Sequence, residues 1–229
     1  MIYPIVLYGD PVLERPAEPV TEFNAELKKL VDDMFDSMYA AHGVGLAAPQ
    51  IGISKRIAVI DTTFKEDPKA KLVLVNPEII GREGKQQGKE GCLSLPDFHE
   101  NLTRANVVTV RAQDVDGKWF EKTGDDLLAR ALLHETDHLN GRLFISHVSA
   151  LKRDLIKRKI KKLARGERRR RIAEVLTALR IDSLAGRRPD QLTPPQRLRT
   201  ALARALAAEP EVLVMDEPLR LLDQRGRAE

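Results

Sequence analysis

The sequence predicts an α+β fold followed by a mostly helical C-terminal appendage. Three observations support it: an amphipathic helical segment near the N-terminus, several short β-rich runs after it, and a strongly apolar helical segment after those runs. Beyond Ser149 the composition changes to a basic helical segment and then to sequence with loops and prolines. We therefore expect one domain over residues 1–150, a basic helix of that domain over residues 151–165, and a separate segment over residues 166–229.

The first helix is predicted between Thr21, a suitable N-cap, and Gly43, a suitable stop. The β-rich runs that follow are RIAVID (56–61), KLVLVNP (71–77), NVVTVRAQDV (106–115) and KWFEK (118–122). The residues DVDG (114–117) predict a hairpin turn between the last two runs. Residues 125–141, DDLLARALLHETDHLNG, are apolar around almost the whole helical circumference, which predicts a helix buried inside the fold.

Composition narrows the class of protein. The 229 residues include 42% hydrophobic residues and one cysteine, so an intramolecular disulfide is excluded. No apolar run approaches the ~20 residues of a membrane-spanning helix, and the start of the chain lacks the pattern of a secretory leader. We expect a cytoplasmic protein without a membrane segment. The net charge of +4 depends on residues 152–171, which hold twelve Lys or Arg and two acids.

Two histidines four residues apart indicate a metal site. His134 and His138 would project from one face of the predicted central helix, and Glu135 follows the first of them. This HExxH arrangement supplies two metal ligands and a carboxylate that can act as a general base or acid. The alternative is a pair of histidines that form hydrogen bonds on a buried helix.

A third ligand is missing downstream. The position six residues after His138 is Phe144, no glutamate lies between His138 and Gly166, and His147 lies beyond the expected helix end. Upstream, Cys92 lies in KEGCLSLPDF, and a thiolate with two imidazoles would leave an open position for water. A lone cysteine is more often a small buried hydrophobe.

A third stretch, HGVGLAAPQIG (42–52), contains closely spaced glycines and small residues, which suggests that its backbone approaches a ligand. Gln50 could offer its amide to a developing oxyanion there. Taken alone, the stretch is equally consistent with a helix C-cap and a turn.

Together, in this order, GVGLAAPQ (43–50), EGCLSLP (90–96) and HETDHLNG (134–141) resemble the three signature motifs of the peptide deformylase family. YGDPVLERPAEPV (8–20) is similar to that family's N-terminal segment, and the resemblance covers roughly residues 1–165. It implies that the metal ligands are Cys92, His134 and His138. It further implies the following roles: Glu135 as the proton shuttle, Gln50 and the backbone N–H of Leu93 as the oxyanion donors, and Gly45 as a backbone contact for the bound peptide.

The resemblance also implies the fold and the reaction. Antiparallel sheets would surround the central HExxH helix, and the enzyme would remove the formyl group from N-formylmethionyl nascent chains, releasing formate. The family usually uses ferrous iron, which nickel, cobalt or zinc can replace. Such chains are made in bacteria, where the enzyme is cytoplasmic, and in organelles. The alternatives are another HExxH metallopeptidase, or a catalytically silent adaptor that binds the ribosome or a nucleotide.

The methionine side chain needs an apolar pocket, for which Val44, Leu127 and Ala131 are candidates, with core packing as the alternative for each. Leu133 stands where the family often has glutamine, and PDFHENLTR (96–104) differs from common versions of that loop. Arg104 is expected to pair with a carboxylate.

The basic helix over residues 151–165 is similar to the C-terminal helix of the family, which implies docking on the ribosome near the exit tunnel. Its charge suits RNA phosphates, and an unpartnered solvated helix is the alternative. The residues GERRRR (166–171) are expected to form a junction.

The C-terminal segment resembles a fragment of an ABC-transporter ATPase, from the signature loop to the D-loop, over residues 190–223. Helices are expected over residues 172–179 and 196–208, followed by a strand VLVM (212–215) and the Walker B pair Asp216 and Glu217. The sequence contains no G-x-x-x-x-G-K-[ST] phosphate loop, and Pro194 and Pro195 have no N–H to donate to a phosphate. We expect no ATP binding.

Overall fold

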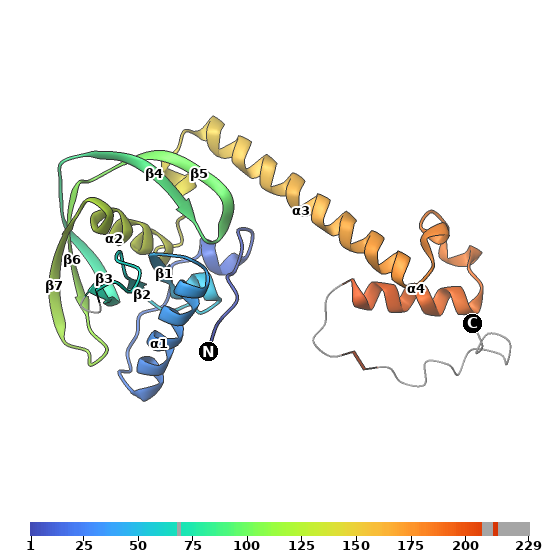
Figure 1. Cartoon of the computed structure of the whole chain (residues 1–229), viewed down its shortest axis with the longest axis horizontal. Helices are drawn as coiled ribbons and strands as arrows, with labels where there is room; N and C mark the ends of the chain where they lie inside the picture. The colour runs from blue at the N-terminus through green and yellow to red at the C-terminus, as the bar shows by residue number, and fades with distance from the viewer. Residues whose placement is uncertain (68–69, 208–212, 215–229) are drawn as a thin grey trace. The chain divides into compact units, whose positions relative to one another are not determined.

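The computed structural model describes residues 1–67, 70–207 and 213–214, and these divide between two compact units, Met1–Arg153 and Asp154–Glu229 (Figure 1). In the first unit the helices and antiparallel sheets confirm the predicted α+β class. Five strands form one sheet in the order β1-β2-β3-β6-β7, and two form a second sheet. The strands are β1 (Gly45–Ala47), β2 (Ile57–Ile60), β3 (Leu72–Glu83), β4 (Gln86–Cys92), β5 (Leu95–Arg104), β6 (Val107–Gln113) and β7 (Trp119–Asp125).

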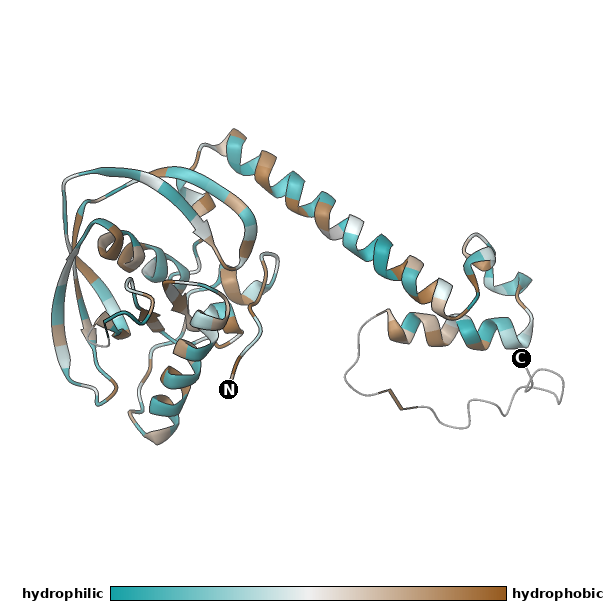
Figure 2. Cartoon of the chain, in the orientation of Figure 1, coloured by the Kyte–Doolittle hydropathy of each residue, from teal (hydrophilic) through white to brown (hydrophobic). Residues whose placement is uncertain are grey.

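The strands β4 and β5 are not among the sequence-predicted elements. They pair antiparallel from Gln86↔Arg104 to Gly91↔His99, with a register shift before Cys92. Figure 2 shows both strands coloured largely hydrophilic, so they lack the apolar alternation that predicts a half-buried strand. By contrast, the predicted turn between β6 and β7 is confirmed, because Asp114 N–H donates to Lys118 C=O at 2.9 Å and Gly117 has φ +81°.

The first helix, α1 (Ala25–Ala40), begins later than predicted. Asn24 is its N-cap, and the Asn24 side chain accepts a hydrogen bond from Leu27 N at 3.0 Å. The expected cap at Thr21 was therefore wrong, and Phe23 packs against the core from outside the helix. The helix ends at Ala40, before the expected stop at Gly43.

The helix α2 (Asp126–Leu139) carries the two histidines. Its apolar residues pack against the five-stranded sheet in one buried cluster that includes Ala129, Leu132 and Leu139, each fully buried. Figure 1 shows α2 lying among the strands of both sheets. Short 3-10 helices complete the first unit: η1 (Pro11–Glu14), η2 (Ala48–Ile51) and η4 (Phe144–His147).

The helix α3 (Ala150–Ala178) begins in the first unit and continues into the second. It runs without a break through residues 166–171, so the expected junction was wrong. Ion pairs along the helix support this continuity, because Arg170 pairs with both Glu167 and Glu174 at helical spacing. The expected helix over residues 172–179 is the end of α3.

The second unit also contains η5 (Asp182–Leu184), η6 (Pro189–Gln191) and α4 (Pro194–Leu206). The helix α4 starts at Pro194 instead of the expected Gln196, because prolines fit the first turn of a helix. A small apolar cluster links these elements: Val175, Ile181, Leu184, Leu192 and Ala203. Only Leu213 and Val214 of the expected strand are described, and they form no strand, while Asp216 and Glu217 lie outside the described residues. None of the described helices is both long and apolar enough to span a membrane.

Candidate metal centre

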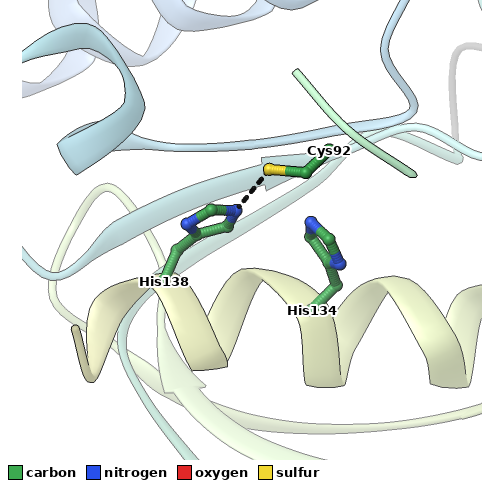
Figure 3. Close-up of side chains that lie close together, drawn as sticks. All are labelled: Cys92, His134 and His138. Carbon is green, nitrogen blue, oxygen red and sulfur yellow. Dashed lines mark hydrogen bonds between the residues drawn. The ribbon is translucent and has the colours of Figure 1, made fainter. Parts of the chain in front are cut away.

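The three predicted ligands converge on one point in the first unit (Figure 3). His134 and His138 lie one turn apart on α2, with ring centroids 5.0 Å apart, and Cys92 is the last residue of β4. The Cys92 sulfur lies 3.2 Å from His138 Nε2. One donor atom from each residue lies within 4.8 Å of the other two. The sequence-predicted set is therefore gathered in space from two elements far apart in the chain.

An irregularity in the pairing of β4 with β5 lies directly before Cys92. The register of β4 and β5 shifts after Gly91, so that Cys92 pairs with Leu95 and the chain reverses through Leu93 and Ser94. This tight reversal places the thiol and the Leu93 backbone at the end of the strand pair.

Glu135 is buried beside the ligands, with 3% of its surface exposed. A Cβ added to Gly45 would lie 2.9 Å from Glu135 Cδ, so the carboxylate rests against bare backbone of β1. Its Oε2 atom is buried and has no hydrogen-bond partner among the described residues. Burial raises the pKa of Glu135 to about 7. A buried carboxylate with a free oxygen is suited to exchange protons with a molecule in the site.

Gln50 is held in a fixed orientation in η2, with 1% of its surface exposed. Its Oε1 accepts a hydrogen bond from Ala47 N–H at 2.9 Å, and its Nε2 lies 3.6 Å from the Cys92 sulfur and 3.4 Å from Ser94 Oγ. The amide N–H₂ group is therefore directed toward the metal ligands. Leu93 follows Cys92 directly and is half-buried.

A cavity of about 550 Å³ opens over these groups. Its wall includes Gly45, Gln50, Leu93, Cys92, His134 and Glu135. The candidate methionine contacts Val44, Leu127 and Ala131 also lie on this wall. Val44 is 36% and Leu127 48% exposed, more than core packing would leave, whereas Ala131 is 5% exposed and belongs to the main core.

Glu90 is a buried carboxylate that contacts one of the ligands, His134, and the sequence did not predict it as a site residue. Glu90 Oε2 is 3.3 Å from His134 Nδ1, and Arg104 donates two hydrogen bonds to the same carboxylate. Arg104 also donates to Asp137, so its expected pairing with a carboxylate is confirmed. These contacts hold the pKa of Glu90 well below its usual range, although burial alone would raise it. The sequence carried one signal, since Glu90 belongs to the EGC stretch.

His147 is not part of the ligand cluster. Its Nε2 lies 2.8 Å from Asp137 Oδ2, and the same oxygen accepts a hydrogen bond from Arg104. The three gathered donors are one thiolate sulfur and two imidazole nitrogens, a set that suits zinc, iron, cobalt or nickel and does not suit calcium or magnesium. With three protein ligands, a position would remain for a reacting molecule.

Two family models match the sequence. The model described as polypeptide deformylase matches residues 2–154, and the model described as ABC transporter matches residues 94–220. The two matches overlap over residues 94–154, which in the structure include β5, β6, β7 and α2 of the first unit. Beyond residue 154, the ABC match agrees with the predicted resemblance of the C-terminal segment.

Curated relatives match about two thirds of the chain or more. A peptide deformylase from Acidobacterium capsulatum is 67% identical over 165 residues, which are 72% of this chain and 97% of that protein. Another from Heliobacterium modesticaldum is 53% identical over 147 residues, which are 64% of this chain and 94% of that protein.

Solved structures agree with these relatives. A crystal structure of a peptide deformylase from Legionella pneumophila has a TM-score of 0.68 and 47% identity, covering 73% of this chain and 98% of that one. A peptide deformylase from Synechococcus elongatus, in complex with actinonin, has a TM-score of 0.65 and 37% identity, covering 71% of this chain and 88% of that one. This chain belongs to the peptide deformylase family of metal-dependent hydrolases, which act on N-formylmethionyl peptides.

Proposed function

We propose that the chain performs its deformylation at a divalent metal held by Cys92, His134 and His138, with ferrous iron as the physiological ion. The observation that carries this assignment is the convergence of the three donor atoms within 4.8 Å of one another, next to the unpaired Oε2 of Glu135. The soft sulfur and the two imidazoles favour a transition metal, so nickel, cobalt or zinc can replace iron.

When bound there, the cation acts as a Lewis acid that makes a water molecule nucleophilic at neutral pH. Glu135 accepts the proton of that water and returns it to the departing amine. Water oxygen forms a bond to the formyl carbon, the formamide C–N bond breaks, and formate and a free α-amino group result. The Gln50 amide and the Leu93 N–H donate hydrogen bonds to the formyl oxygen as its negative charge develops.

The substrate extends between two strand edges. The cavity wall includes Gly45 of β1, the end strand of the larger sheet, and Lys89 to Cys92 of β4, one strand of the smaller sheet. A peptide in extended conformation can form main-chain hydrogen bonds along such edges, with Gly45 as one contact. Val44, Leu127 and Ala131 then surround the methionine side chain.

The competing metallopeptidase function has less support. Proteases with HExxH helices take their third ligand from residues after the helix, and here Phe144 is buried and His147 is engaged with Asp137. The third donor comes from β4 instead, upstream of the helix. A silent adaptor is disfavoured by the buried, unpaired oxygen of Glu135, which has no structural partner within the described part of the chain.

The basic residues of α3 support a further partner. Residues 151–165 expose Lys152, Arg158, Lys159, Lys161 and Lys162, a density of charge suited to RNA phosphates. We assign this stretch to ribosome docking and the enzyme to the bacterial cytoplasm, with an organelle as the alternative. Residues 166–229 are assigned no ATP-dependent role, because the sequence contains no phosphate loop.

One assay tests the metal, the substrate and the base together. Protein purified without oxygen should release formate from formyl-Met-Ala-Ser and leave unblocked Met-Ala-Ser uncut. Glu135→Gln should retain the metal, measured by elemental analysis, and lose ~10²–10⁴-fold in kcat. Cys92→Ser should lose the metal itself. Full activity of Glu135→Gln, or cleavage of the unblocked peptide, would refute the assignment.

A further inference from the structure

Glu90 is a buried carboxylate on β4, and side chains from two other elements, β5 and α2, contact both of its oxygens. Arg104 Nε donates to Oε1 at 2.9 Å, and Arg104 Nη2 donates to Oε2 at 3.0 Å. Arg130 Nη1 donates to Oε1 at 2.6 Å. A carboxylate bound at both oxygens by two guanidinium groups cannot rotate without breaking charge-assisted hydrogen bonds.

We call these hydrogen bonds from Arg104 and Arg130 to Glu90 the clamp. A glycine leaves the space that the Arg130 guanidinium occupies in it. A Cβ added to Gly88 would lie 2.7 Å from Arg130 Nη2 and 3.0 Å from Arg130 Cζ, so the guanidinium fills the space that the glycine leaves. Arg130 lies on α2 one turn before His134, and Arg104 is the last residue of β5. The clamp therefore fixes Glu90 relative to the same helix that carries the histidine ligands.

The remaining contact of Glu90 is with a metal ligand. Its Oε2 lies 3.3 Å from His134 Nδ1. A carboxylate at Nδ1 favours the tautomer in which Nδ1 carries the proton, which leaves the lone pair of Nε2 for a metal.

The second histidine has no such support. His138 Nδ1 is buried and has no hydrogen-bond partner in the described part of the chain, while His138 Nε2 lies 3.2 Å from the Cys92 sulfur. The two imidazoles of the cluster therefore differ in how they are held. His134 contacts the carboxylate of Glu90, and the polar contact of His138 in the described part of the chain is with the Cys92 sulfur.

We propose that Glu90 is the positioning residue of the metal centre, which sets the tautomer and ring orientation of His134 and does not act on His138. Arg104 and Arg130 keep Glu90 in place for this task. The role rests on the proposed metal site, and it assigns to this one carboxylate the preorganisation of a ligand.

Glu90→Gln tests the role with readouts that do not depend on turnover. In zinc-loaded protein, long-range ¹H–¹⁵N spectra of the histidine rings report each tautomer. The wild type should show His134 protonated at Nδ1, and the variant should lose this fixed state while the His138 signals stay in place. Zinc affinity, measured by competition with a chelator, should fall ~10–100-fold.

Asp137→Asn is the matched control, because Asp137 also binds Arg104 in the same buried network but contacts His147 instead of a ligand. It should cost stability and leave the His134 tautomer and zinc affinity unchanged. If Glu90→Gln fails to fold, Glu90→Gln combined with Arg130→Gln removes one charge of each sign and serves for the same measurements.

A folded Glu90 variant with the wild-type tautomer and wild-type zinc affinity would overturn the role. An equal loss of affinity in Asp137→Asn would overturn it too, because the effect would then belong to the network as a whole. The wild type is measured first: if it binds no zinc at Cys92, His134 and His138, the proposed function itself fails, separately from any effect of Glu90.

Discussion

The carboxylate of Glu135 rests against the Cα of Gly45, and this contact leaves no room for a methyl group. A Cβ at position 45 would lie 3.1 Å from Glu135 Cγ and closer still to its carboxylate. Gly45→Ala should therefore displace the proposed base, and a displacement of about 1 Å costs ~10²-fold in rate. The measurement is kcat/KM for formate release, together with metal content, which should not change.

Gly166→Ala provides the control for this substitution. Position 166 lies within α3, and an added Cβ there meets nothing within 4 Å. Alanine favours a helix over glycine by ~1 kcal/mol, so this variant should keep its activity and be equally or slightly more stable. Wild-type kcat/KM in Gly45→Ala would show that Glu135 can move without loss.

Site residues could be predicted from the sequence where their spacing within one element brings them together. The spacing of His134 and His138 places them on one helical face before any tertiary structure is known. Cys92 and Gln50 needed the combination of three motifs, because their proximity is created only by folding. Glu90 could not be predicted as a site residue, since its meaning depends on Arg104 and Arg130 meeting it across three elements.

At the scale of elements, one buried carboxylate joins α1 to the loop after β2. Asp61 is fully buried and accepts hydrogen bonds from Tyr39 Oη at 2.6 Å, Thr63 N at 2.9 Å and Lys65 N at 3.0 Å. Phe64 and Lys65 have φ of +52° and +77°, a left-handed conformation that these bonds help to maintain. Asp61 thus joins α1 to a loop whose backbone adopts an unfavourable left-handed conformation at two residues that are not glycine.

This connection predicts a specific acid sensitivity. Burial alone would raise the pKa of Asp61, but the hydrogen bonds from Tyr39 and Thr63 lower it to about 2. The folded state thus binds the proton less tightly than the unfolded state, whose pKa is ~3.9. The stabilisation is complete above ~pH 4 and is lost as the pH falls toward 2.

Asp61→Asn should therefore lower the free energy of unfolding at pH 7 by ~2 kcal/mol and weaken its dependence on pH below 4. Urea unfolding across this pH range measures both effects. Asp36→Asn is the control, because Asp36 is exposed on the same helix as Tyr39. An Asp61→Asn variant as stable as Asp36→Asn at pH 7 would show that the connection is not stabilising.

Three features escaped prediction, each for a different physical reason. The strands β4 and β5 are held by backbone pairing and by a charged buried network, so apolar alternation does not mark them in the sequence. The start of α1 depended on which of several polar residues would cap it. The unbroken course of α3 includes Gly166, which the sequence suggested as part of a junction, and the ion pairs of Arg170 at helical spacing follow directly after it.

At the scale of the molecule, charge is divided between the parts of the chain. Residues 152–171 contain twelve Lys or Arg and two acids, so the remainder holds 38 − 12 = 26 basic and 34 − 2 = 32 acidic residues. The net positive charge of the chain therefore comes from this one stretch.

The resemblance of the C-terminal segment to an ATPase fragment could be read from sequence motifs. Its structure was predicted only in part, because α4 begins at Pro194, two residues before the expected Gln196, where prolines fit the first turn of a helix.

The position of the site residues in the chain predicts that residues 166–229 are dispensable for catalysis. Every proposed ligand, proton carrier and oxyanion donor lies in the unit Met1–Arg153, as does each residue of the cavity wall. A protein ending at Arg165 should therefore keep kcat/KM for formyl-Met-Ala-Ser within a factor of ~2, since the groups that bind the transition state are unchanged. A second protein ending at Ala178 keeps α3 whole and separates the loss of half a helix from the loss of the rest. A tenfold fall in both would mean that the C-terminal segment contributes to the site, and a fall only in the shorter one would assign that contribution to α3.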